Sequence, residues 1–343
     1  MYAILIYFIL AEVAILFITL IYIAILRIFS PYLEKRNQKI QNELSSLIVS
    51  HLTQFQQKSI SFSSPLFASY NNLLQVLENF EKRFKDDAWN KIKDEICRRY
   101  LLPHARKRVM SWFWKKRLFA ARILALSPQT EDASGIALLI KDRLFLVSSH
   151  AIRAAISLET KELLFRVLDK MHLLSGYPYY FCRDLLLHGS NKLFNWIEEF
   201  ASESKSMTFH LTLLDLLSTK TYPLISLDLT EDLDTKNPER RLCAVRLLSR
   251  NPQPNSKDVL LKALEDKNNE IRAEAARGLH FFQEEICFKK LNHALNDKVW
   301  DVRLEAGVAL KKMGETGGAI LKKQDSTSQP AAYEVAHYVL RFY

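Results

Sequence analysis

The sequence predicts an all-α protein in which a single membrane-spanning helix is followed by a solenoid of about seven or eight helix pairs. Three observations carry this prediction. A long apolar run stands at the N-terminus, glycine is scarce at 8 of 343 residues, and a segment near the C-terminus repeats at a nearly fixed period. Apolar residues recur at i, i+3, i+4 and i+7, which is the helical pattern, and no alternating strand pattern with Asn-Gly or Asp-Gly turns accompanies it.

The apolar run covers residues 3–26 and contains one charged residue, Glu12. Its 24 residues exceed the roughly 20 that a helix needs to cross the hydrocarbon core of a bilayer. A cleaved signal peptide would have a basic segment before a shorter apolar core and small residues at the cleavage site. Here no basic side chain precedes the run, and Arg27-Ile-Phe-Ser-Pro31 follows it. Residues 1–27 are therefore expected to be an uncleaved transmembrane anchor.

Basic residues directly after the run set the expected orientation. Arg27, Lys35, Arg36 and Lys39 outnumber the acids Glu34 and Glu43 in this segment. Because short basic segments stay on the cytoplasmic side of a membrane, the N-terminus should face outside and the remaining chain the cytoplasm. The expected location is the bacterial inner membrane, crossed once.

Glu12 lies near the middle of the predicted span, where a carboxyl group is costly and is a functional candidate by default. Thr19 follows seven residues later on the same helical face, and the small residues Ala11 and Ala14 would let another helix approach closely. This pattern favours a docking seam for a membrane protein partner, or for a second copy of the helix in a homo-oligomer. The alternative is a protonated Glu12 that is tolerated without a role.

Residues 28–86 are expected to form a juxtamembrane helical stalk. Residues 34–55 read as an amphipathic helix, residues 58–65 (KSISFSSP) as a linker, and residues 66–85 as a second helix. The two helices either pack on the first repeats or mediate self-association.

The repeat is clearest within residues 227–321. An aspartate is followed six residues later by an arginine, then by a small residue and a leucine, and the period is 32 and then 31 residues. The aspartate belongs to a turn, and Asn237 before Pro238 is typical of a helix N-cap with proline at the first helical position. The pairs in these three copies are Asp234 with Arg240, Asp266 with Arg272, and Asp297 with Arg303.

This motif resembles the HEAT-repeat family, in its short bacterial form related to the phycobilisome-lyase-type repeat. The resemblance implies a stack of helix pairs in which the turn aspartates and helix arginines form a structural ladder. It also implies two functions known among relatives, protein binding and, in some members, chromophore lyase activity. Those lyases are soluble and lack an anchor, so the resemblance gives the lyase activity little weight here.

Weaker copies precede these repeats at about the same period. Residues 87–226 are expected to form degenerate repeats, with Arg117, Ser148, Tyr179 and His210 near the corresponding positions. At the other end, residues 322–343 are expected to contribute a linker and a helix from Ala331 to Phe342 that caps the array, since a solenoid needs a terminal cover.

The net charge of +10 is concentrated in one stretch, residues 96–130, which has nine basic residues and no acid. Three aromatic residues, Trp112, Phe113 and Trp114, lie within it. A localised positive field attracts an anionic partner, so anionic lipid, an acidic protein or, less readily, nucleic acid could bind there. The bland alternative is a solvated basic face. The nine residues are Arg98, Arg99, Arg106, Lys107, Arg108, Lys115, Lys116, Arg117 and Arg122.

Enzyme motifs are absent: the sequence has no Gly-rich phosphate loop, GxSxG, HExxH or paired-carboxylate pattern. Four widely spaced cysteines form no CxxC or Cys/His cluster, so no metal, no cofactor and no disulfide scaffold is expected, and the thiols should be buried and free. We therefore expect a non-enzymatic scaffold that binds a membrane protein, and a cytoplasmic protein on its concave face, within an envelope-polysaccharide, transport or secretion complex. The alternatives are a nucleic-acid-binding protein and a lyase-type enzyme.

Overall fold

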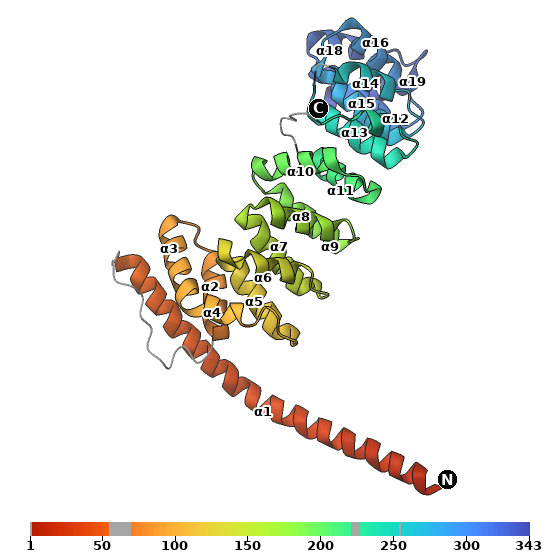
Figure 1. The fold of residues 1–343 in the computed structure, drawn as a ribbon. Coiled ribbons are helices and arrows are strands. Elements are labelled where there is room, and N and C mark those ends of the chain that lie inside the picture. Colours follow the sequence, from red (N-terminus) through yellow and green to blue (C-terminus); the bar gives the residue numbers. More distant parts are fainter. Residues whose placement is uncertain (1, 55–69, 221–226, 254) are drawn as a thin grey trace. The chain divides into compact units, whose positions relative to one another are not determined.

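The computed structural model describes residues 2–54, 70–220, 227–253 and 255–343, and leaves the side chains of residues 2–11, 26, 53 and 54 undescribed. All regular elements in these ranges are helical, as the sequence predicted, and no strand occurs among them (Figure 1). The chain divides into two compact units, residues 1–154 and residues 155–343. The predicted linker at residues 58–65 lies outside the described residues.

Unit 1 begins with one long helix, α1, and continues with shorter helices that pack together. Their bounds are α1 (Tyr2–Gln54), α2 (Tyr70–Glu81), α3 (Asp87–Ile96), α4 (Leu102–Arg106), α5 (Trp114–Leu126), α6 (Ala133–Ile140) and α7 (Phe145–Leu158), whose last residues belong to unit 2. A π-helical turn at Cys97–Leu101 joins α3 to α4, and a 3₁₀ turn at Thr130–Asp132 precedes α6.

Helix α1 is continuous, whereas the sequence suggested two helices separated near Pro31. Pro31 lies inside the helix and removes one backbone hydrogen bond. The residue is exposed, so water or lipid headgroups can satisfy the carbonyl oxygen that loses its partner. Every described side chain from Glu12 to Lys39 is exposed, while Leu44 and Ile48 are fully buried against the rest of unit 1. Within the described residues, α1 is the one helix that is long and apolar enough to cross a membrane.

Unit 2 consists of helices that alternate in direction and stack. They are α8 (Lys161–Met171), α9 (Tyr177–Leu187), α10 (Asn191–Glu203), α11 (Met207–Thr219), α12 (Thr230–Asp234), α13 (Pro238–Arg250), α14 (Ser256–Ala263), α15 (Asn269–Gly278), α16 (Glu285–Ala294), α17 (Trp300–Lys312), α18 (Glu315–Lys322) and α19 (Pro330–Phe342). Helices α11, α13, α15 and α17 pack side by side in that order, and α19 packs on α17.

From α4 to α19 the described helices can be written as eight consecutive pairs, in agreement with the predicted seven or eight. The second helix of each pair is α5, α7, α9, α11, α13, α15, α17 or α19, and this helix carries the repeat motif where the motif is present. The predicted N-cap is confirmed, because the Asn237 side chain accepts hydrogen bonds from the backbone N–H groups of Glu239 and Arg240.

Small residues allow these second helices to approach closely. Ala244, Ala275, Ala276 and Ala306 are fully buried between neighbouring helices. A Cβ atom added at Gly278 would lie 2.7 Å from the Ser249 Cα atom on the adjacent helix. The four cysteines are buried and free, as expected. Burial raises the pKa of the Cys97 and Cys243 thiols to about 12, so neither is a reactive thiolate at neutral pH.

Candidate functional site

The repeats are joined by a ladder in which an arginine of one repeat binds an aspartate in the turn of the next. Arg272 on α15 donates from Nε and Nη2 to the two carboxylate oxygens of Asp297, at 2.8 and 3.0 Å. Its Nη1 also donates to the backbone oxygens of Asp266 and Lys267, at 2.9 and 3.2 Å. The guanidinium therefore fixes its own turn and the following turn at once, which is the bidentate geometry that arginine favours.

The first rung of the ladder differs from the sequence prediction. Asp266 is bound by Arg241, through Nε at 3.0 Å and Nη2 at 3.2 Å, and not by Arg240. Arg240 instead pairs with Asp232, and Asp234 makes an exposed contact with Lys262 at 3.3 Å. Aligning the sequence on the aspartates misplaced the register by one residue. The true period is 31 residues in both steps, from Arg241 to Arg272 to Arg303.

The same 31-residue column extends through the degenerate repeats as Arg117, Ser148, Tyr179 and His210. Arg117 repeats the geometry of Arg272: it binds Asp142 through Nε at 2.5 Å, and its Nη1 donates to the backbone oxygens of Ser111 and Trp112. The Tyr179 hydroxyl donates to Asp215 at 2.5 Å, and His210 Nε2 lies 2.9 Å from Asp232. At Arg117, Tyr179 and His210 the side chain changes while an aspartate remains its partner, whereas the Ser148 hydroxyl donates to the Phe145 backbone oxygen of its own helix.

Hydrogen bonds to the ladder carboxylates favour their ionised form. Burial alone would raise the pKa of Asp297, but hydrogen bonds from Arg272 and from the Val299 N–H outweigh it, so the pKa lies below its ordinary value. The pKa of Asp266 is lowered in the same way, against its own burial, by Arg241 and the Asn268 N–H.

Arg303 is the last arginine of the column, and it binds no aspartate side chain among the residues that the structure describes. Its Nη1 donates to the backbone oxygen of Asp297 at 2.9 Å, and its guanidinium lies over the Trp300 ring. Its buried Nε has no hydrogen-bond partner. The residue 25 positions further on is Ser328, where a continuing ladder would have an aspartate.

A second charged row crosses α13, α15 and α17. Arg246 pairs with Glu274 at 3.2 Å, Glu274 with Arg277 at 2.9 Å, and Arg277 with Glu305 at 2.6 Å. These side chains line a cleft of about 350 Å³. The acids Glu270 and Asp301 also line the cleft, are exposed, and form no salt bridge within the part of the chain that the structure describes. The sequence analysis did not find this row, although Arg246 and Arg277, like Glu274 and Glu305, are 31 residues apart.

The nine basic residues at 98–122 do not act as one positive surface. Arg106 binds Glu131 and Asp132, Arg117 binds Asp142, and Arg122 donates through Nε to Glu78 at 2.8 Å. These acids lie outside residues 96–130, so the charge of that stretch alone does not include them. Among the described salt bridges, five other basic residues of the stretch have no acidic partner: Arg98, Lys107, Arg108, Lys115 and Lys116.

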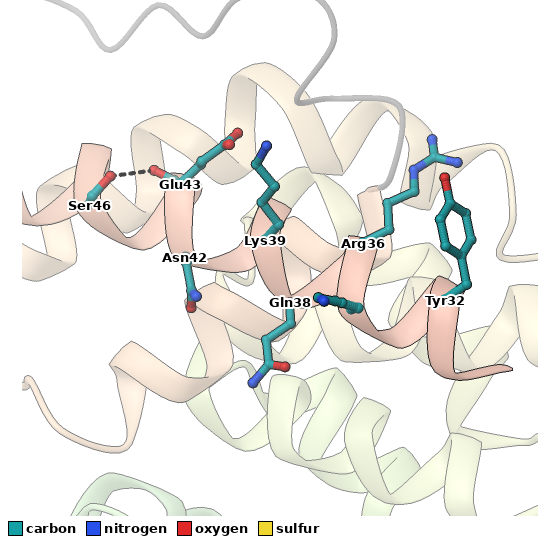
Figure 2. Close-up of a pocket in the computed structure, with 8 residues that line it drawn as sticks. Tyr32, Arg36, Gln38, Lys39, Asn42, Glu43 and Ser46 are labelled. Carbon is teal, nitrogen blue, oxygen red and sulfur yellow. Dashed lines mark hydrogen bonds between the residues drawn. The ribbon is translucent and has the colours of Figure 1, made fainter.

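Among the described residues, no side-chain interaction links Glu12, Ala14 or Thr19 to another helix. Glu12 and Ala14 are exposed, Thr19 is exposed and donates to the Leu16 backbone oxygen of its own helix at 2.8 Å, and the Ala11 side chain is not described. Further along α1, basic side chains border a polar hollow whose lining residues all belong to this helix (Figure 2). Arg36 and Lys39 project there beside Tyr32 and Glu43. The docking seam at Glu12 stays a prediction.

No group of His, Cys, Asp and Glu side chains in the described ranges is arranged to hold a metal ion. Two of the described pockets are lined in part by residues of the ladder or of the second charged row, which already have structural partners.

Comparison with known proteins identifies the C-terminal repeats. Residues 227–311 match the family described as HEAT repeats, so this segment consists of HEAT repeats, as the sequence motif indicated. No curated protein matches the sequence significantly.

Solved structures of similar helical arrangement share little sequence with the chain. Escherichia coli YibA is 15% identical, with 76% of this chain and 98% of that chain covered and a TM-score of 0.38. Human deoxyhypusine hydroxylase in complex with glycerol is 15% identical, with coverages of 88% and 96% and a TM-score of 0.29. A mutant of Kap121p is 13% identical, with coverages of 91% and 46% and a TM-score of 0.40.

Proposed function

We propose that the chain is a membrane-anchored scaffold whose HEAT repeats bind partner proteins at the cytoplasmic face of a bacterial inner membrane. The observation that carries this proposal is the combination of two parts in one chain. One unit has a helix that is long, apolar and exposed, and the other has stacked HEAT repeats. Stacked repeats present an extended surface made from equivalent positions of successive helices, which suits protein binding.

The charged cleft of α13, α15 and α17 is the surface that we assign to the partner. Glu274 and Glu305 are engaged with arginines that tie neighbouring repeats together, so they are needed for structure. Glu270 and Asp301 are exposed at the same cleft and have no such task. Exposed carboxylates beside a fixed ion-pair row favour a partner segment with basic side chains.

The anchor would restrict the partner to the membrane surface. A membrane-embedded component of an envelope-polysaccharide, transport or secretion complex fits this placement, with Glu12 and its neighbours as the contact within the bilayer. The exposed acids support protein binding over nucleic acid at this cleft, because carboxylates repel phosphate groups.

The test is co-purification from membranes with charge reversal at the cleft. The full-length chain with Glu270→Arg and Asp301→Arg is solubilised in mild detergent, and the recovered proteins are quantified by mass spectrometry. The matched control carries Glu315→Arg and Glu334→Arg, two exposed acids on α18 and α19 that do not line this cleft.

We expect recovery of at least one specific partner to fall by fivefold or more in the cleft variant and to stay unchanged in the control. Equal recovery of every partner in both variants would remove the cleft from the proposal. Recovery of nucleic acid in place of protein, lost in the cleft variant alone, would replace scaffold function by nucleic-acid binding.

A further inference from the structure

A short turn between α4 and α5 exposes an unusual group of large apolar side chains. Met110 is 84% exposed, Trp112 92% and Phe113 64%, and Trp114 is also exposed. We call these four residues the aromatic tip. Adjacent exposed side chains of this size form an apolar patch, and such patches mark surfaces that meet a partner or a membrane.

The backbone of the aromatic tip is held in place by the ladder arginine of unit 1. Arg117 Nη1 donates to the Ser111 and Trp112 backbone oxygens, both at 2.9 Å, while its Nε and Nη2 bind Asp142. The Phe113 N–H also donates to the Ser111 hydroxyl at 3.3 Å. The tip is therefore presented on a fixed turn, which lowers the entropy lost on binding.

Four basic residues flank the aromatic tip in the sequence. Lys107 and Arg108 precede it and Lys115 and Lys116 follow it. Lys115 Nζ lies 5.9 Å from the centre of the Trp114 ring, and Lys116 Nζ lies 5.3 Å from that of Phe113. None of these four residues forms a salt bridge within the described part of the chain. Exposed apolar side chains with neighbouring cations are complementary to an anionic bilayer, whose phosphates lie above its acyl chains.

Contacts between α1, α2 and α4 place the Tyr70 end of α2 and His104, which precedes this turn, on the side of unit 1 nearer the apolar run. Asn37 of α1 accepts from Asn72 of α2 at 3.1 Å, and further along Gln41 donates to Gln75 at 2.6 Å. Residue numbers thus rise together, so α1 and α2 run parallel and Tyr70 lies at the end of α2 that points toward the apolar span. The Tyr70 ring lies 4.0 Å from that of His104 on α4, three residues before Lys107.

The distance to the bilayer is short enough for contact. Arg27 ends the apolar span, and Asn37 follows ten residues later, which is about 15 Å along a helix. Tyr70 precedes Asn72, the hydrogen-bond partner of Asn37, by two residues and is therefore roughly 3 Å nearer to the apolar span. The lipid headgroup layer occupies about 5–7 Å of the distance that remains between Tyr70 and the end of the span. A tilt of the anchor of about 20°, which is usual for membrane helices, would bring one side of unit 1 to the surface.

From this arrangement we propose that the aromatic tip inserts into the interface of an anionic lipid bilayer and gives the chain a second membrane contact beside α1. This inference rests on the proposed membrane anchoring. Tryptophan is enriched at membrane interfaces, and a second contact would fix the direction in which the repeats leave the membrane.

A spin label at the tip tests insertion directly. Met110→Cys can be labelled selectively because the four native cysteines are buried. The full-length chain is reconstituted into vesicles of neutral lipid or of neutral lipid with about 30% anionic lipid, a composition chosen to provide the surface potential that attracts basic segments. Collision of the nitroxide with oxygen and with a water-soluble nickel complex reports its depth. The matched control label is at Leu173, which is 75% exposed in unit 2.

We expect the label at residue 110 to be shielded from nickel on anionic vesicles and the label at residue 173 to stay in water. Neutralising Lys107, Lys115 and Lys116 to glutamine should weaken insertion about fivefold for each lysine at low salt. A control with Lys236, Lys322 and Lys323 changed to glutamine removes the same charge from exposed sites in unit 2 and should leave insertion intact.

Equal nickel access at residues 110 and 173 on anionic vesicles would overturn the proposal, as would shielding of residue 110 by a DNA or RNA oligonucleotide but not by lipid. The anchor is judged separately, by flotation of the chain with vesicles after alkaline carbonate washing. A chain that is washed off refutes the anchor, whereas a floating chain with an exposed label refutes the tip alone.

Discussion

Removing the guanidinium of Arg272 is the most direct test of the ladder. The Arg272→Ala substitution deletes two hydrogen bonds to Asp297 and two to the turn at Asp266 and Lys267. The Asp297 carboxylate then retains the hydrogen bond that it accepts from the Val299 N–H, at 2.9 Å. Both side chains of the pair are 16% exposed, so solvent can compensate only in part.

The expected cost follows from this geometry. Leaving a mostly buried charged group without its partner costs about 1–3 kcal/mol, and we take about 2–3 kcal/mol because the pair is bidentate and little exposed. Unit 2 has about 190 residues, a size at which each kcal/mol lowers the melting temperature by roughly 2–4 °C. The melting temperature of the full-length chain in detergent should therefore fall by about 4–12 °C.

Arg303→Ala is the matched control, because Arg303 occupies the same column without an aspartate partner and with its Nε unpaired. We expect it to cost less than about 1 kcal/mol. Since a solenoid can unfold locally, hydrogen exchange of α15 and α17 is measured along with the melting curve. Equal losses for Arg272→Ala and Arg303→Ala would show that the pair with Asp297 contributes nothing specific.

Four further outcomes are expected. Gly317→Ala should destabilise unit 2 by about 1–3 kcal/mol in a denaturant titration, because the added Cβ would lie 1.9 Å from the Leu310 backbone oxygen. A Cβ added at Gly318 meets nothing within 4 Å, so Gly318→Ala should be neutral or stabilising. Similar denaturation curves for the two variants would refute this packing. Because the pKa values of Asp266 and Asp297 lie below their ordinary value of 3.8, the two carboxylates contribute stability that is complete well above pH 3.8 and is lost as the pH falls below about 4. Arg272→Ala should reduce this acid-sensitive part of the stability. An unchanged dependence of unfolding on acid pH in that variant would contradict the prediction. Glu12→Leu should leave membrane insertion intact and partly reduce recovery of a membrane partner, since hydrogen bonds between membrane helices are worth about 0.6–2 kcal/mol; full recovery would make Glu12 a tolerated residue. A reporter fused after Tyr343 should be cytoplasmic, and phosphatase activity of that fusion in the periplasm would reverse the topology.

Helix content, the apolar N-terminal helix and the HEAT repeats could be predicted from the sequence because each depends on the spacing of residues that are close together in the chain. A period of 3.6 residues marks a helix face, a long apolar run marks α1, and the recurrence of Asp and Arg marks the turn and second helix of a repeat. Asn237 could be recognised as an N-cap for the same reason, since it binds the N–H groups of the next residues. Even the 31-residue column from Arg117 to Arg303 is present in the sequence, although its donors change from arginine to serine, tyrosine and histidine.

Pairing between distant charges required the tertiary structure. Arg122 pairs with Glu78, 44 residues away in the sequence, and Arg106 and Arg117 pair with acids 25 or 26 residues away. The stretch is basic in composition, but these ion pairs neutralise part of its charge in the folded chain. The register of the first rung depended on which of two adjacent arginines, Arg240 or Arg241, faces the next turn. That choice is made by the packing of α13 against α15 and not by local propensity.

The same division applies to the surfaces. The sequence placed Trp112, Phe113 and Trp114 in a basic segment, where aromatic residues are as often core as surface. The structure shows them exposed on a turn whose backbone is hydrogen-bonded to Arg117, and Arg117 is itself fixed by Asp142 of the next repeat. Side-chain chemistry and local period are thus determined by the sequence, whereas the side chains that remain exposed are decided by contacts between residues far apart in the chain.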